Sequence, residues 1–117
     1  MPPPIPSYNF KQGATFSLGG FASLPTGSGY FWEATAELRD GNGALISELQ
    51  VTLLAPTYPD TKWPLLLYQD ATETATWPLG PLYCDIRFVN GTTVLPTATF
   101  VVNIVLRITT SQPTLML

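Results

Sequence analysis

The sequence of 117 residues contains no histidine and a single cysteine, Cys84. Histidine is the commonest general base and metal ligand, so its absence excludes a Ser-His-Asp triad and the usual histidine-based metal sites. One cysteine excludes an intramolecular disulfide, and with it the disulfide framework of small secreted domains. Cys84 falls on the apolar face of an alternating segment, which predicts a small core residue rather than a reactive thiol.

Charged residues are scarce as well. They make up 11% of the chain, against about 25% in typical globular domains. The five basic residues form no run and the net charge is −3, which argues against nucleic acid as a partner. No apolar run approaches the roughly 20 residues that span a membrane, and residues 1–6 lack the pattern of a signal peptide. Low charge with many Pro, Thr and aromatic residues suits a β protein whose surface is largely covered by neighbours.

Helical periodicity is also missing, and short alternating runs take its place. They predict strands over residues 8–10, 14–21, 30–39, 44–54, 62–69, 82–89, 92–95 and 100–108. Asp40-Gly41-Asn42-Gly43 and Asn90-Gly91 are hairpin signals, and Gly19-Gly20 suggests a bulge. Pro96 suggests an edge position, a bulge or a switch between sheets.

One short helical turn is expected after the strand at 62–69. Asp70 and Glu73 have the spacing of a capping box, in which each side chain accepts from the other residue's amide, and Trp77-Pro78 ends the turn. A helical turn followed by a core strand and a hairpin fits one corner of an immunoglobulin-like sandwich. The fold prediction is therefore an all-β, single immunoglobulin-like antiparallel β-sandwich of about seven strands. Its predicted core comprises Phe16, Trp32, Ala34, Ala36, Leu49, Val51, Leu65, Leu67, Cys84, Ile86, Phe88, Phe100 and Val102.

The acidic residues offer little chemistry. Glu33 and Glu37 share one strand face roughly 13 Å apart, at about 3.3 Å per residue, which exceeds the about 5–9.5 Å of a glycosidase pair. We interpret them as part of a solvated face, and expect Asp85 and Arg87 to pair with charges on adjacent strands. The turn at Asp40 superficially resembles a calcium loop but lacks its fifth-position and distal ligands.

The aromatic residues are a better lead, because they are too many for one small core. Some of them should lie at a protein interface, where aromatic residues are enriched, or stack on sugars. The set comprises Tyr30, Phe31, Trp32, Trp63, Tyr68, Trp77 and Tyr83.

Three stretches carry a family resemblance. They are Tyr8-x-Phe10-x-Gln12-Gly13-x-Thr15-Phe16, then Thr74-Ala75-Thr76-Trp77-Pro78-x-Gly80-x-Leu82-Tyr83-x-Asp85-Ile86, and a closing strand that ends Ile108-Thr109. Over about residues 7–110 the chain resembles small immunoglobulin-like virion proteins of tailed bacteriophages, and is similar to the N-terminal domain of phage upper-baseplate proteins. The resemblance implies a virion component of the baseplate, fibre attachment, neck or capsid decoration, with no catalytic residues. No long fibre region follows the sandwich, which favours an accessory subunit over a fibre adaptor.

These observations together predict a non-enzymatic structural subunit of a phage virion, with no cofactor and no metal. The alternative is a carbohydrate-binding or receptor-binding module of a phage tail. The domain prediction is an extended arm over residues 1–6, a sandwich over 7–110 and a second arm over 111–117. The expected partners are other virion proteins and further copies of the chain, but no nucleic acid and no membrane. The residues predicted to contact partners are Ile5, Val101, Val105, Leu115, Met116 and Leu117.

Overall fold

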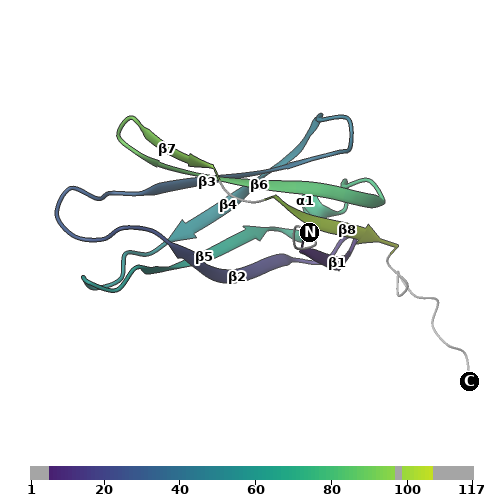
Figure 1. Ribbon diagram of the computed structural model, residues 1–117. Coiled ribbons are helices and arrows are strands. Elements are labelled where there is room, and N and C mark those ends of the chain that lie inside the picture. The colour runs from purple at the N-terminus through teal and green to yellow at the C-terminus, as the bar shows by residue number, and fades with distance from the viewer. Residues whose placement is uncertain (1–5, 97–98, 107–117) are drawn as a thin grey trace, which may run out of the picture.

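The computed structural model describes residues 6–96 and 99–106. They form an all-β fold, as predicted, with one short helix (Figure 1). Residue 108, the predicted end of the last strand, lies outside the described residues. The elements are β1 (Ser7–Lys11), β2 (Phe16–Ser23), β3 (Glu33–Arg39), β4 (Leu45–Leu53), β5 (Lys62–Gln69), α1 (Ala71–Thr74), β6 (Gly80–Asn90), β7 (Thr93–Pro96) and β8 (Phe100–Val105).

The strands form one continuous sheet that is nearly barrel-like. Its order is β1-β8-β6-β3-β4-β5-β2, and β7 pairs with β6 off this path. β7 has no other partner among the described strands, so Pro96 does lie on an edge strand. The expectation of a purely antiparallel fold is wrong for β1 and β8, which run parallel. Parallel neighbours need a long connection, and here almost the whole described chain lies between them.

β4 changes partner halfway along its length. Its residues up to Leu49 pair with β3, and its residues from Gln50 onward pair with β5. Figure 1 shows the result: β3, β6 and β7 lie in an upper layer, β2 and β5 lie in a lower layer, and β4 crosses from one to the other. The core fills the space between the layers.

A bulge interrupts the pairing of β3 with β4. Leu38 pairs with Ser47, but the next residue, Arg39, pairs with Leu45, so Ile46 is the extra residue. The expected alternation of β4 therefore fails at its start. Leu45, predicted to face inward, is 47% exposed, while Ile46 packs against the core. No such shift occurs in the pairing of β2 with β5, so the bulge expected at Gly19-Gly20 is absent.

The core largely follows the prediction. Nine of the thirteen predicted residues are buried, and the remaining four, Ala34, Val51, Leu65 and Phe100, are partly buried against them. All three tryptophans, Trp32, Trp63 and Trp77, are buried as well. Leu106, expected on the inner face of the last strand, is exposed because β8 ends at Val105.

The helical turn α1 is hydrogen-bonded to the turn that connects β1 to β2. Asp70 caps it by accepting from the Glu73 amide at 2.8 Å. The Glu73 carboxylate does not complete a capping box but accepts from Ser47 Oγ at 3.0 Å. The buried Thr74 hydroxyl donates to the carbonyl of Ala14 at 2.6 Å, and Gln12 Nε2 donates to the carbonyl of Trp77 at 2.7 Å. α1 is thereby held against the turn between β1 and β2.

An aromatic cluster closes the sheet at the same end. The rings of Phe10 on β1, Phe16 on β2 and Trp77 after α1 pack pairwise, with centroids 5.1 to 5.7 Å apart. Their mostly edge-to-face geometry is the arrangement that aromatic rings prefer. β1 and β2 are therefore joined through side chains at this end, although no backbone ladder pairs them.

The buried tryptophans make a matched pair for a stability test. Trp63 Nε1 donates to the carbonyl of Leu24 at 3.0 Å, whereas Trp77 Nε1 has no partner among the described residues. Trp63→Phe leaves a buried carbonyl unsatisfied, while Trp77→Phe removes an unpaired donor. We expect Trp63→Phe to lower the free energy of unfolding by about 1 kcal/mol more than Trp77→Phe does, measured by urea denaturation. An equal or larger loss for Trp77→Phe would contradict this account.

Candidate protein-binding surface

The outer face of the lower layer carries an apolar hollow. Two cross-strand rows form it, one of Thr52, Leu66 and Gly19, the other of Leu54, Pro64 and Phe21. This outer hollow has a volume of about 360 Å³. Leu66 is 39% exposed, Leu54 57% and Phe21 71%, and none of the residues that line the hollow is charged.

Local sequence explains why these side chains point outward. Successive residues of a strand face opposite sides, so the buried Leu67 forces Leu66 to the outside. In β2, Phe16 and Ala22 are buried on the inner face, which puts Gly19 and Phe21 on the outer face. Gly19 has no side chain and so leaves space between Thr52, Leu66 and Phe21 unfilled. The sequence analysis did not single out this surface, although the run Leu65-Leu66-Leu67 signalled that a leucine must face outward.

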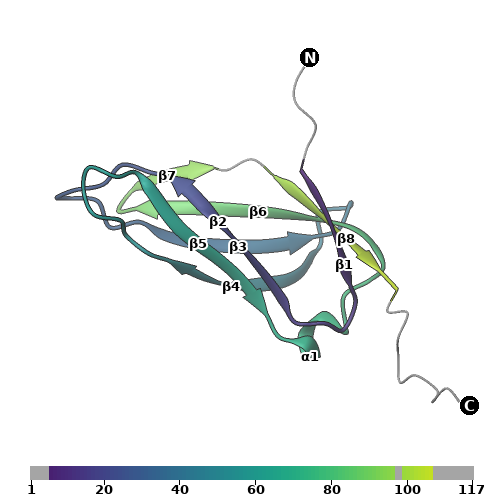
Figure 2. The ribbon, with the colours of Figure 1, turned by 90° about the horizontal axis from the view of Figure 1, so that it is seen from below.

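A second opening lies between β1 and β2. Figure 2 shows the two strands close together beside α1 and diverging away from it. The divergence leaves a pocket of about 210 Å³, here called the wedge, with Leu65, Leu67 and Ile86 at its base. The other residues that line it are Pro6, Tyr8, Leu18, Gly19, Gly20, Phe21, Thr99 and Phe100.

Only two of the residues predicted to bind partners are among the residues that the structure describes. Val101 and Val105 lie on the outer face of β8, half-buried, opposite Ser7 and Lys11 of β1. Asn103 separates them and donates to Asn9 Oδ1 at 3.2 Å, so the two valines form no continuous apolar patch. The other predicted residues, Ile5, Leu115, Met116 and Leu117, lie outside the described residues. Of this set, the structure describes only Val101 and Val105.

A third surface, at the opposite end from α1, carries exposed aromatic rings. Phe31 is 79% and Tyr58 69% exposed, and the ring of Tyr58 lies over Gly27, within 3.1 Å of where a Cβ would be. The Phe31 amide donates to Asn90 Oδ1 at 3.0 Å, which ties this loop to the β6–β7 hairpin. The strand predicted from residue 30 begins only at Glu33, and Tyr30 before it is 41% exposed.

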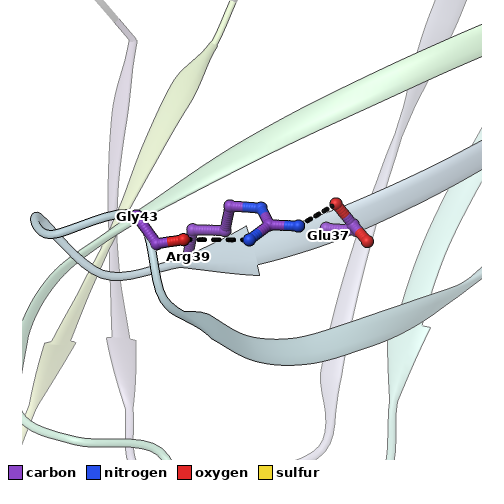
Figure 3. Close-up of polar contacts among 3 residues, drawn as sticks. All are labelled: Glu37, Arg39 and Gly43. Atoms are coloured by element: carbon purple, nitrogen blue, oxygen red, sulfur yellow. Dashed lines mark hydrogen bonds and ion pairs between the residues drawn. The ribbon is translucent and has the colours of Figure 1, made fainter.

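Three carboxylates form a row across the upper layer. Glu37 lies opposite Glu48 on β4 and opposite Asp85 on β6. Arg39 bonds to Glu37 Oε1 and to the carbonyl of Gly43, each at 2.9 Å, so it braces the β3–β4 hairpin (Figure 3). An ion pair this exposed contributes at most about 1 kcal/mol. The cross-strand charge pairing predicted for Asp85 is not found among the described residues, where Asp85 accepts from Thr99 Oγ1 at 2.5 Å.

The described residues include no group of three Cys, Asp or Glu side chains that could hold a metal ion. Arg87, which was also expected to pair with a charge, lies opposite the uncharged Thr35 and Pro96. The row of carboxylates is therefore a solvated acidic stripe in this structure, partly neutralised by Arg39.

No protein-family model matches the chain, and no curated protein matches it. Among the described residues, no helix is long and apolar enough to cross a membrane. Function must therefore be argued from the surfaces themselves and from the resemblance noted in the sequence.

The lone thiol is protected by its position. Cys84 is fully buried, and burial, with a smaller contribution from the Asp85 charge, raises its pKa from 9.0 to about 12. Because the pKa is raised on folding, the associated stability is present below pH 9.0 and is lost as the pH rises toward 12. The thiolate is the nucleophile that attacks thiol reagents. In the native protein Cys84 is therefore protected twice, because it is buried and because it stays protonated.

We expect the native protein not to react with Ellman's reagent at mildly alkaline pH. After denaturation in guanidinium chloride, one thiol per chain should react. The reaction is followed by absorbance, with Cys84→Ala as the blank. Rapid stoichiometric reaction of the folded chain would show that Cys84 is accessible and would overturn its assignment to the core.

Proposed function

We propose that this chain is a non-enzymatic assembly subunit that binds other protein subunits through the outer hollow, and that the assembly is the virion of a tailed bacteriophage. The observation that carries the proposal is the gathering of Phe21, Leu54 and Leu66 on one outer face with no charge among the lining residues. Contiguous apolar surface of this kind is typical of protein interfaces. The part of the proposal that names a virion rests on the resemblance of the sequence to immunoglobulin-like virion proteins of tailed bacteriophages.

The low charge of the chain supports the same proposal. Interfaces are depleted of charged residues at their centres and enriched in aromatic ones. Phe21 is more exposed than Leu54 and Leu66, the other large apolar side chains exposed in the hollow, and it also borders the wedge. An aromatic anchor beside a pocket is the arrangement in which binding energy concentrates. We propose an immunoglobulin-like arrangement of the layers as the finer description of this fold, with the outer hollow on the β2–β5 side.

The test is incorporation into particles. A phage that lacks this gene is complemented with the wild-type chain, with Leu66→Glu or with Thr35→Glu, and purified particles are analysed by quantitative mass spectrometry. Leu66→Glu should reduce incorporation at least about tenfold, because an interface would have to bury an unpaired carboxylate. Thr35→Glu adds the same charge to an exposed position of β3 in the other layer and should incorporate normally.

Circular dichroism and thermal melting establish that each variant is folded before it is used. The proposal fails if the wild-type chain is absent from purified particles. It also fails if folded Leu66→Glu is incorporated as well as the wild type is.

A second candidate function rests on the exposed rings of Tyr30, Phe31 and Tyr58 at the loop end. Aromatic rings on neighbouring loops could stack on sugars, which would make the chain a carbohydrate-binding or receptor-binding module of a tail. On a glycan array we expect no specific retention of the wild-type chain. Reproducible binding that is lost in Phe31→Ala and Tyr58→Ala but kept in Leu66→Glu would assign the function to the loop end instead.

A further inference from the structure

The wedge is an unfilled place in the inner face of the sheet. Gly20 lies on the same face of β2 as Leu18 and the buried Ala22. Yet a Cβ built on Gly20 would meet no atom within 4 Å. Tyr8 and Phe100, packed edge to face at 5.7 Å, form the opposite wall. The core therefore ends here against an open space of about 210 Å³ with aromatic walls.

The chemistry of the wedge selects an uncharged, apolar occupant. None of its lining residues, all within the described part of the chain, carries a charge. Aromatic-lined grooves of this type bind proline-rich segments, whose extended conformation is largely formed before binding and so loses little entropy. A charged or strongly polar peptide would lose its hydration without finding a partner.

This chain carries such a segment next to the wedge. Residues 1–5 read Met-Pro-Pro-Pro-Ile and contain no charged side chain. The residue that follows, Pro6, is itself a wall of the wedge, and its carbonyl accepts from the Val101 amide at 2.8 Å. The segment is therefore anchored at the mouth of the wedge. At about 3.1 Å per residue its five residues reach about 15 Å.

The occupant of a wedge belongs to a second copy rather than to the same chain. To enter its own wedge, the segment would have to reverse direction within a run of prolines, and proline restricts both itself and the residue before it to extended angles. Two copies placed mouth to mouth need no reversal, since each segment runs straight into the other copy. Such an exchange is symmetrical and closes as a dimer.

We propose that the wedge between β1 and β2 binds residues 1–5 of a second copy of this chain, so that two copies associate by exchanging proline-rich arms. Ile5 and Pro4 are the side chains closest to the anchor at Pro6 and fill the space beside Gly20. The inference rests on the proposed assembly role and deepens it by naming one partner, and it uses the wedge, which adjoins the outer hollow along Gly19, Gly20 and Phe21.

Two valine variants of the full chain test the wedge. Gly20→Val places a side chain inside the wedge, where there is room for it in the free chain. Ser17→Val adds the same side chain at an exposed position on the outer face of the same strand, which lines neither the wedge nor the outer hollow. Sedimentation velocity should show that the wild type dimerises, that Gly20→Val raises the dissociation constant at least tenfold, and that Ser17→Val does not.

Removal of residues 1–5 provides a second variant that leaves every described residue in place. It should abolish the dimer as Gly20→Val does. The proposal is overturned if the wild type stays monomeric up to millimolar concentration, if the truncated chain dimerises as well as the full chain, or if Gly20→Val and Ser17→Val behave alike.

Photo-crosslinking identifies the occupant directly. Ile5→p-benzoylphenylalanine is prepared in ¹⁵N-labelled and unlabelled chains, which are mixed before irradiation. Cross-links from position 5 to peptides of β1 or β2 that join a labelled to an unlabelled chain support the exchange. Cross-links found only within one chain, or only to the outer hollow, contradict it.

The two proposals can fail separately. A chain that dimerises through the wedge but is absent from particles would refute the virion role alone. A chain that enters particles but never exchanges its arms would refute the dimer alone.

Discussion

The change of partner by β4 is the constraint on which the rest of this structure depends. A single strand pairs with β3 up to Leu49 and with β5 from Gln50 onward, so it belongs to both layers. The turn from one layer to the other is thus made inside a continuous strand. As a consequence, the ladder between β3 and β4 ends at the pair Ala36 and Leu49, and the residues of β3 before Ala36 have no partner on β4. The bulge at Ile46 adds local twist, which helps β4 to leave the upper layer.

Bending one sheet in this way leaves its two ends facing each other. β1 and β2 are those ends, and they are also consecutive in the chain. Near α1 they are held together by the rings of Phe10, Phe16 and Trp77. Further along, Gly20 supplies no side chain to fill the gap. The closure is therefore complete at one end and open at the other, and both candidate binding surfaces meet at Phe21 beside the opening.

Much of this fold could be predicted from local sequence, because alternation and turn chemistry are local properties. They predicted the strands, the capped turn at Asp70 and most of the core correctly. Strand order, the parallel pairing of β1 with β8 and the bulge at Ile46 depend on contacts distant in the sequence, which no local pattern encodes. The candidate site was missed for a related reason. The alternation of side chains along each strand puts Phe21 and Leu66 on the outer face of the sheet. Only the pairing of β2 with β5 makes them neighbours.

β2 is an edge strand beside the wedge, and it lacks the features that usually protect such an edge. Edge strands of natural proteins are commonly protected against association by charged residues, prolines or bulges. β1 carries Lys11 and β7 ends at Pro96. β2, from Phe16 to Ser23, has neither a charge nor a proline, its register is unbroken, and among the described strands it pairs only with β5. An unprotected edge can pair with another chain, so this edge, beside a pocket without charge, agrees with the proposed binding of a second copy at the wedge.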